Sequence, residues 1–311
     1  MRLALAGDTM LGRKVAERPP GTLLAPEVVA VAREADVFLL NLECCIAEGG
    51  SPWPDPRKPF FFRAPPAAVD VLTRLGAACV TLANNHALDF GPEALLDTLD
   101  YLDAAGIAQA GAGRDLEEAR QPALLDAGGL RLAVVAFSDH PPEYAAGRGK
   151  PGIAFADLRD GLPAWVADAV REAPADAVVV SPHWGPNMTA GPLPQVRAAA
   201  RELVAAGATL VAGHSAHVFH GVAGPVLYDL GDFLDDYRVD PVLRNDLGLL
   251  VLATLAEGEF RALEAVPVKL DFCRTRLADG ADAAWIRERF RLACAALGTG
   301  VREVEGRLVI P

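Results

Sequence analysis

The stretch CVTLANNHALDFGPEALLDTLDYLDAA (79–105) contains both halves of a strand-to-helix unit. The apolar run Ala78–Ala83 has the length and composition of a buried strand, whereas Gly91–Ala105 has apolar residues at the spacing of one helix face. Three polar side chains, Asn84, Asn85 and His86, stand between the two. A buried strand that leads through a polar turn into an amphipathic helix is typical of α/β proteins, so this stretch predicts that fold class.

The same alternation continues along the rest of the chain. Further strands are predicted at Arg2–Gly7, Asp36–Asn41, Leu130–Phe137, Ala177–Ser181 and Thr209–Ala212, and further helices at Pro26–Ala35, Pro66–Leu75, Leu158–Glu172 and Pro194–Ala206. A later run, Val226–Asp229, Leu247–Leu255 and Phe260–Val268, is predicted to be antiparallel and indicates a second sheet. No linker or repeat divides the chain. We therefore predict one domain over residues 1–311, with 258–311 as a C-terminal segment that completes it.

Composition excludes several classes of protein. The chain has 311 residues, 51% of them hydrophobic, and a formal net charge of −12, without the basic cluster that a nucleic-acid-binding surface needs. No run of 18 apolar residues predicts a spanning helix, and the N-terminus lacks the length and cleavage site of a signal peptide. The five cysteines form no CxxC pattern and are expected to be reduced thiols. A cytoplasmic protein without direct membrane insertion is the expectation.

Most of the candidate functional side chains directly follow a predicted strand. They are Asp8, Glu43, Asn84, Asn85, His86, His183, His214 and His217. In open α/β sheets, ligands bind beyond the carboxyl ends of the strands, so these residues are expected to converge. Each also has a simpler explanation: Asp8 could cap the next helix, Glu43 could be solvated, and His183 could be a structural histidine.

Mixed carboxylate and imidazole side chains are ligands suited to Zn²⁺, Mn²⁺ or iron. One or two such ions would polarise a phosphoryl or acyl oxygen and generate a hydroxide nucleophile near neutral pH. Glu43 is the best candidate for a carboxylate that bridges two ions. The sequence therefore predicts a metal-dependent hydrolase.

At these positions the sequence resembles the CapA family, the poly-γ-glutamate capsule biosynthesis proteins with a calcineurin-like metallophosphoesterase fold. The matching strings are GDTMLGR (7–13), NLE (41–43), LANNHALDFG (82–91), SPHWGPN (181–187), GHSAHVFHG (213–221) and LYDLGDFLDDY (227–237). They occur in the family's order over residues 1 to 250. The resemblance implies a four-layer α/β/β/α sandwich.

The resemblance also implies roles for individual residues. It places Asp8, Glu43 and His217 around one metal, and Asn85, His183 and His214 around another. His86 would face the substrate as a proton donor or oxyanion stabiliser, oriented by Asp89. Asn84 is expected to contact the substrate, which would be a small anionic or polyanionic molecule.

Three positions depart from the family pattern. Met10 stands where many metallophosphoesterases have a histidine, and a thioether is a poor ligand for a hard ion. Glu43 stands where classical members have Asp, and Gly213-His214-Ser215-Ala216-His217 replaces a GxHPH string. Three functions remain open: a phosphoesterase that acts through metal-activated water, a factor in poly-γ-glutamate synthesis or release that works within a complex, and a metal-stabilised binding module without catalysis.

Two sets of residues near these motifs have open roles. Lys58 and Arg63 lie in a loop rich in proline and aromatic residues, where they either recognise an anion above the metals or form part of a packed surface loop. Asp232, with Asp235 and Asp236 after it, either orients a ligand histidine or begins a solvated loop.

Overall fold

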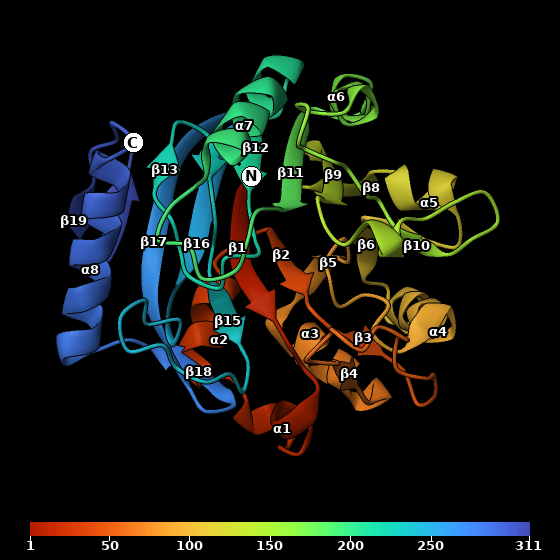
Figure 1. The fold of residues 1–311 in the computed structure, drawn as a ribbon. Coiled ribbons are helices and arrows are strands. Elements are labelled where there is room, and N and C mark those ends of the chain that lie inside the picture. The colour runs from red at the N-terminus through yellow and green to blue at the C-terminus, as the bar shows by residue number, and fades with distance from the viewer.

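The computed structural model describes residues 1–311 and contains two large β-sheets covered by helices (Figure 1). The strands of the larger sheet are β1 (Arg2–Thr9), β2 (Val37–Leu42), β5 (Ala77–Thr81), β6 (Ala108–Ala110), β15 (Asp232–Leu234), β16 (Leu247–Ala256), β17 (Glu259–Asp271), β18 (Arg274–Leu277), β19 (Arg302–Val304) and β20 (Arg307–Ile310). Those of the second sheet are β8 (Ala123–Ala127), β9 (Leu130–Ser138), β11 (Ala177–His183), β12 (Leu210–Ala212), β13 (Val222–Ala223) and β14 (Val226–Leu227). Two short pairs join β3 (Cys45–Ile46) to β4 (Arg63–Ala64) and β7 (Ala112–Gly113) to β10 (Gly152–Ile153).

The helices connect these strands and lie on the outside of the sheets. They are α1 (Arg13–Ala16), α2 (Pro26–Ala32), α3 (Val69–Leu75), α4 (Gly91–Ala104), α5 (Leu116–Arg120), α6 (Ala164–Arg171), α7 (Pro194–Ala206) and α8 (Gly280–Ala295). In Figure 1, α6 and α7 lie at the top, α4 and α5 at the right, and α8 along the left edge. None of the helices is long and apolar enough to cross a membrane.

Strand order fixes which strand ends lie side by side. The larger sheet runs β19-β20-β17-β16-β1-β2-β5-β6, and β1 is parallel to β2 on one side and antiparallel to β16 on the other. Strand β15 also pairs with the end of β1, in parallel. The second sheet runs β13-β14-β12-β11-β9-β8, with β9, β11, β12 and β14 parallel. The carboxyl ends of β1, β2 and β5 therefore lie together, as do those of β9, β11 and β12.

Alternate residues of each sheet supply different hydrophobic cores, as the two-residue period of a strand requires. In β1, Ala4 and Ala6 pack against α2 and α3, whereas Leu3 and Leu5 face the core between the two sheets. The other face of the second sheet packs against α6 and α7. The order of layers is helices, sheet, sheet, helices, which confirms the predicted α/β/β/α sandwich.

The C-terminal segment belongs to the same sheet as the N-terminal strand. Strands β17 and β20 extend the sheet beyond β16, and Ile286 and Phe290 of α8 are buried in the core between the sheets. We therefore retain the proposal of one domain over 1–311.

Three predictions differ from the structure. The strands predicted at Leu247–Leu255 and Phe260–Val268 do not form a second sheet, because β16 pairs with β1 and β17 pairs with β16 in the larger sheet. The strand predicted at Val226–Asp229 is not wholly antiparallel, because β14 pairs in parallel with β12 and in antiparallel fashion only with β13. The helix predicted from Leu158 begins only at Ala164. Gly161, with a φ of +101°, and Pro163 separate the earlier residues from the helix.

Gly7 allows β1 and β15 to approach each other closely. A Cβ atom on Gly7 would lie 1.8 Å from the backbone oxygen of Gly231, which cannot move away as a side chain could. We expect Gly7→Ala to lower the free energy of unfolding by about 2–4 kcal/mol. Chemical denaturation of the metal-free protein measures this loss. Gly300→Ala is the matched control, because no atom lies within 4 Å of that Cβ position; an equal stability of the two variants would contradict the argument.

Candidate metal centre

The predicted strand-end residues converge where the two sheets meet. Asp8 is the penultimate residue of β1 and pairs with Asn41 of β2 on one side and Asp232 of β15 on the other. In the second sheet, His183 ends β11 and forms a β-bridge with His214, which follows β12. The two sheets thus bring together carboxylates from the first and imidazoles from the second.

Four of these side chains form a compact buried cluster. Asp8, Glu43, His217 and Asp232 each offer a ligand atom, and these atoms all lie within 4.8 Å of one another. His217 Nδ1 lies 2.8 Å from Asp232 Oδ1 and 3.5 Å from Asp8 Oδ2. None of the four residues is more than 8% exposed. Three carboxylates and an imidazole at this spacing can enclose one divalent ion.

His183 and His214 extend the cluster toward the second sheet. His183 Nε2 lies 4.0 Å from Glu43 Oε1, and His214 Nδ1 lies 3.2 Å from Asp8 Oδ1. Glu43 therefore belongs to the four-residue cluster and also lies near the His183 imidazole.

Several polar atoms of the centre are buried without a hydrogen-bond partner. They are Glu43 Oε1, Asn85 Oδ1, both ring nitrogens of His183, His214 Nδ1 and Asp232 Oδ2. Leaving such atoms unpaired costs free energy, about 1–3 kcal/mol for each neutral group and more for charged ones. Because all of these atoms are electron-pair donors or can be, bound divalent ions would satisfy them together. The donor set therefore fits a metal centre of one or two ions.

The pKa shifts of the ionisable groups also favour a bound cation at this centre. Burial and then repulsion from Asp8 raise the pKa of Glu43 well above its ordinary value. Burial disfavours ionisation of Asp8 as well, but the neighbouring His214 imidazole, 3.2 Å away, holds its pKa below the ordinary range. Burial lowers the pKa of His183 well below its usual value, so this imidazole is in the neutral form that binds metals. A cation would compensate the negative charge that crowds here.

Backbone strain accompanies the loop that carries the two histidines. Ser215 has a φ of +108° and His217 a φ of +60°, values that are uncommon for residues other than glycine. The packing around the loop maintains both conformations, for example through the hydrogen bond from Ala216 N to Asp229 Oδ2. Such strain concentrates at functional sites. It allows His214 and His217 to reach the same Asp8 carboxylate despite the altered string around them.

His86 and Asp89 form a dyad beside the cluster. His86 Nδ1 lies 2.6 Å from Asp89 Oδ2, and burial lowers the pKa of His86 to about 4. Asp89 is fully buried and also accepts hydrogen bonds from Phe62 N and the Tyr144 hydroxyl. These contacts fix the carboxylate and, through it, the orientation of the His86 ring.

Three expected substrate contacts occupy other positions. The Asn84 side chain is fully buried and donates to Asn41 Oδ1 and the Leu42 carbonyl, so it supports the strand ends rather than facing a ligand. Lys58 pairs with Asp89 Oδ1 at 2.9 Å and donates to the Asn85 carbonyl. Arg63 donates to the Gly49 carbonyl and lies over the Phe90 ring at 4.4 Å. The structure therefore favours the packed-loop alternative for Lys58 and Arg63, because both cations contact protein groups and neither lines the cleft beside His86 and His217.

Asp232 is more central than an orienting residue alone. Its hydrogen bond to His217 agrees with the orienting role, and its position within 4.8 Å of three other donors makes it a ligand candidate as well. Asp235 and Asp236 are buried too, so the alternative of a solvated loop is wrong. Met10 is fully buried in the core beneath the larger sheet, with its sulfur accepting from Gly12 N. The first motif has Met10 in place of a histidine, but the oxygen donors of Asp232 lie beside Asp8.

Sequence reasoning overlooked two features of the centre. The Tyr237 hydroxyl donates to Glu43 Oε2 at 3.1 Å, and only the fold brings these residues together. The sequence indicated no role for His140, whose ring lies 5.2 Å from that of His183 and whose Nδ1 lies 2.5 Å from Asp139 Oδ1. Asp139 and His140 directly follow β9, the neighbour of β11, so the strand-end rule could have found them.

The sequence is similar to those of bacterial capsule synthesis proteins. Residues 2–237 match the family model described as bacterial capsule synthesis protein PGA_cap. A "probable polyglutamine synthesis accessory protein" of Mycobacterium tuberculosis is 36% identical over 306 residues, covering 88% of this chain and 79% of the relative. The PGA biosynthesis protein CapA of Bacillus subtilis is 29% identical and covers 75% of this chain and 63% of its own length.

Among solved structures, a hypothetical protein from Thermus thermophilus has a similar fold. It superposes with a TM-score of 0.51 at 18% sequence identity, over 87% of this chain and 100% of the other. This likeness supports the fold alone.

Proposed function

Because the chain belongs to the PGA_cap family of bacterial capsule synthesis proteins, we propose that it is a metal-dependent hydrolase that cleaves a phosphoester. The observation that carries this proposal is the buried set of carboxylates and imidazoles whose polar atoms lack partners. A protein that needed these residues only for packing would have no reason to bury so many unpaired donors.

Asp8, Glu43, His217 and Asp232 would hold one ion, and Asn85, His183 and His214 a second one, with Glu43 between them. Mn²⁺, Zn²⁺ or iron suits this mixture of oxygen and nitrogen ligands. Such ions supply Lewis acidity and lower the pKa of water, so that hydroxide is available near neutral pH. The protein contributes a dry and fixed surround, in which Tyr237 holds one oxygen of Glu43 and Asn41 Nδ2 donates to Asp8 Oδ1 at 2.8 Å.

His86 supplies the proton transfer in this proposal. With its pKa at about 4, the imidazole is neutral at pH 7, and its Nδ1 proton is directed at Asp89. Nε2 is then free to accept a proton from the attacking water and to return it to the leaving oxygen. Phe62 stacks on the ring with centroids 3.9 Å apart, which excludes water from one face and fixes the plane of the transfer.

A role in poly-γ-glutamate synthesis or release is the second candidate, favoured by the names of the Mycobacterium and Bacillus relatives. The substrate would then be an anionic γ-amide polymer, and the protein would work with other capsule-synthesis components. The same centre could polarise an amide carbonyl. Release of oligomers from purified poly-γ-glutamate, without turnover of phosphoesters, would favour this candidate over the first.

The test of the proposed function is hydrolysis of p-nitrophenyl phosphate by protein reconstituted with Mn²⁺, Zn²⁺ or Fe²⁺, compared with the chelated protein. We expect turnover only with metal, and His86→Asn should lower kcat by about 10²–10⁴-fold, since general acid–base groups contribute that much. The metal content of the His86→Asn protein should stay at the wild-type value, because this imidazole is outside the ligand set. Turnover that survives complete chelation would contradict the proposal.

A further inference from the structure

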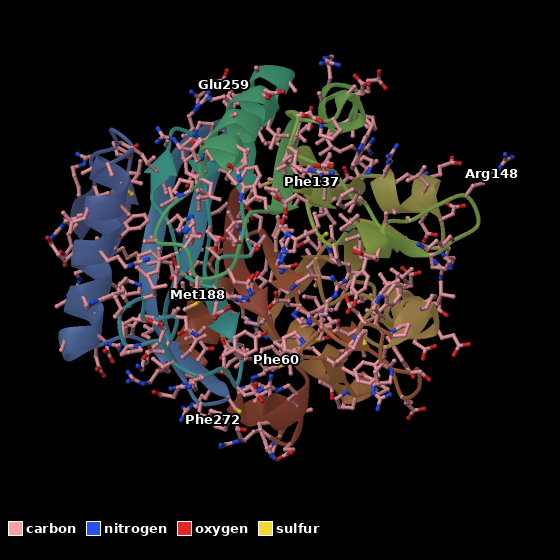
Figure 2. The ribbon with its side chains drawn as sticks, in the orientation of Figure 1. Phe60, Phe137, Arg148, Met188, Glu259 and Phe272 are labelled. Atoms are coloured by element: carbon pink, nitrogen blue, oxygen red, sulfur yellow. The ribbon has the colours of Figure 1, made fainter.

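A cleft of about 610 Å³ opens above the metal centre. His86, His217 and Tyr237 form its inner end, and Phe60, Phe62, Met188 and residues 238–241 form its walls. Phe60 and Met188 lie near the middle of the view in Figure 2, whereas Arg148 lies on a loop at the right edge. The cleft is larger than a reacting phosphoryl group needs, so most of its volume is available to the rest of a substrate.

One wall of the cleft is aromatic. Phe62 stacks on both His86 and Tyr237 at interplanar angles of 27°, and only 2% of it is exposed. Phe60 continues this surface outward and is 56% exposed. Exposed aromatic area next to a polar centre is typical of a surface that binds an apolar or flat part of a ligand.

Two arginines lie along the same cleft. Arg13 lies over Phe62 and Phe60, with its guanidinium carbon 5.3 and 5.7 Å from the ring centroids. Its ion pair with the buried Asp236, at 3.0 Å, fixes one edge of the guanidinium, and about a third of the side chain stays exposed. Arg238 is exposed, and its guanidinium has no hydrogen-bond or ion-pair partner in the protein.

Asp240, the acidic residue that lines the cleft, accepts hydrogen bonds within its own loop. Asp240 accepts hydrogen bonds from Val242 N and Leu243 N, both at 2.8 Å. Asn245 closes the same loop by accepting from Asp240 N and donating to the Arg238 carbonyl. Arg238 therefore extends from an ordered loop; its charge acts on Asp240, but the two side chains form no direct ion pair.

We propose that Arg13 and Arg238 bind a second anionic group of the substrate, while the aromatic wall holds the spacer between that group and the scissile bond. This inference rests on the proposed function and adds its substrate class: an ester with a carboxylate or phosphate at its far end. The protein carries a net charge of −12, so a local pair of cations is needed to admit such a molecule. Arginine is suited to the task because its planar fork binds carboxylates and phosphates through two hydrogen bonds.

Calorimetric binding of three phosphonates to the full Mn²⁺-loaded protein tests the proposal without turnover. The probes are phenylphosphonate, 4-carboxyphenylphosphonate and 1,4-phenylenebisphosphonate, which share one ring and differ in the second charge. We expect at least one doubly charged probe to bind about 10-fold tighter than phenylphosphonate, as a charge-assisted pair allows. The larger of the two advantages identifies which anion the subsite takes.

Arg238→Gln should reduce that advantage to less than about 3-fold, and Arg238→Glu should reverse it. Arg148→Gln removes the same charge from an exposed loop away from the cleft and should leave the advantage intact. Equal affinities in the wild type, or equal losses in Arg238→Gln and Arg148→Gln, would overturn the subsite. Turnover of aryl phosphates without a preference for the doubly charged probes would overturn the subsite and leave the proposed hydrolase standing. Tighter binding of the doubly charged probes without turnover of aryl phosphates would support the subsite and contradict the proposed hydrolase.

Discussion

Replacing His183 or His214 with alanine is expected to reduce metal-dependent hydrolysis of p-nitrophenyl phosphate by about 10³-fold or more. Each imidazole is nearly inaccessible to solvent and carries a ring nitrogen without a partner in the protein. An alanine methyl group cannot bind a metal, and it leaves the neighbouring Glu43 and Asp8 carboxylates with less compensation. Because the proposed reaction depends on the ions for both the nucleophile and the stabilisation of charge, losing one ligand affects both contributions.

Elemental analysis of the same proteins separates a lost ligand from a damaged fold. We expect up to two equivalents of transition metal in the wild type and about one equivalent less in each variant. His220→Ala is the matched control: His220 is also buried, lies on the same loop, and hydrogen-bonds the Thr189 carbonyl outside the cluster. This control should keep its metal and its turnover. Activity retained in both the His183 and His214 variants would show that the ligand assignment is mistaken.

The strand-end rule explains why so much of the centre could be predicted from the sequence. Asp8, Glu43 and His183 each follow a run of apolar residues that is short and dense enough to be recognised as a buried strand. Parallel neighbours in one sheet end on the same side, so local patterns were sufficient to group Asp8 with Glu43, whereas the packing of the two sheets brings His183 to them. The layered fold followed from the same alternation.

Residues whose role depends on distant partners could not be predicted in this way. Arg63 and Lys58 belong to one loop of suitable charge, but a carbonyl at Gly49 and a carboxylate at Asp89 already engage them. Conversely, Arg13 and Arg238 are 225 positions apart in the sequence and line one cleft only because β15 pairs with β1. Sequence alone gives the charge of a side chain but not the group with which it forms an ion pair or hydrogen bond.

The pairing of β1 with β15 also changes the interpretation of Met10. The thioether of Met10 is a poor ligand for a hard ion, so the first motif lacks a donor that the family pattern supplies. Parallel pairing places Asp232 opposite Asp8, so a carboxylate from a strand more than 220 residues later lies in the cluster. We therefore propose that Asp232 supplies a donor that the first motif lacks.

Asp232→Asn is expected to act in opposite directions on the metal-free and metal-bound protein. Burial, followed by repulsion from Asp235 and Asp8, raises the pKa of Asp232 well above its ordinary value. The folded state therefore holds this proton more tightly than the unfolded state. The stability that the carboxyl contributes is complete below about pH 4 and declines as the pH rises through the folded-state pKa. The amide has no proton to lose, so the metal-free variant should be the more stable protein at pH 7, by about 1 kcal/mol, with a flatter pH profile.

With metal the order reverses, because the variant loses a negative donor. At a free metal concentration 1,000 times the Kd, binding stabilises the wild type by about 4 kcal/mol. A 10- to 100-fold weaker Kd in the variant would remove about 1.4–2.7 kcal/mol of that gain. Thermal unfolding of both proteins, with and without Mn²⁺ and across pH, measures all four states. Asp160→Asn, an exposed change of the same kind, should shift neither curve. If the Asp232 variant gained as much from metal as the wild type, Asp232 would be outside the ligand set, and the cluster would have to hold its ion through Asp8, Glu43 and His217 alone.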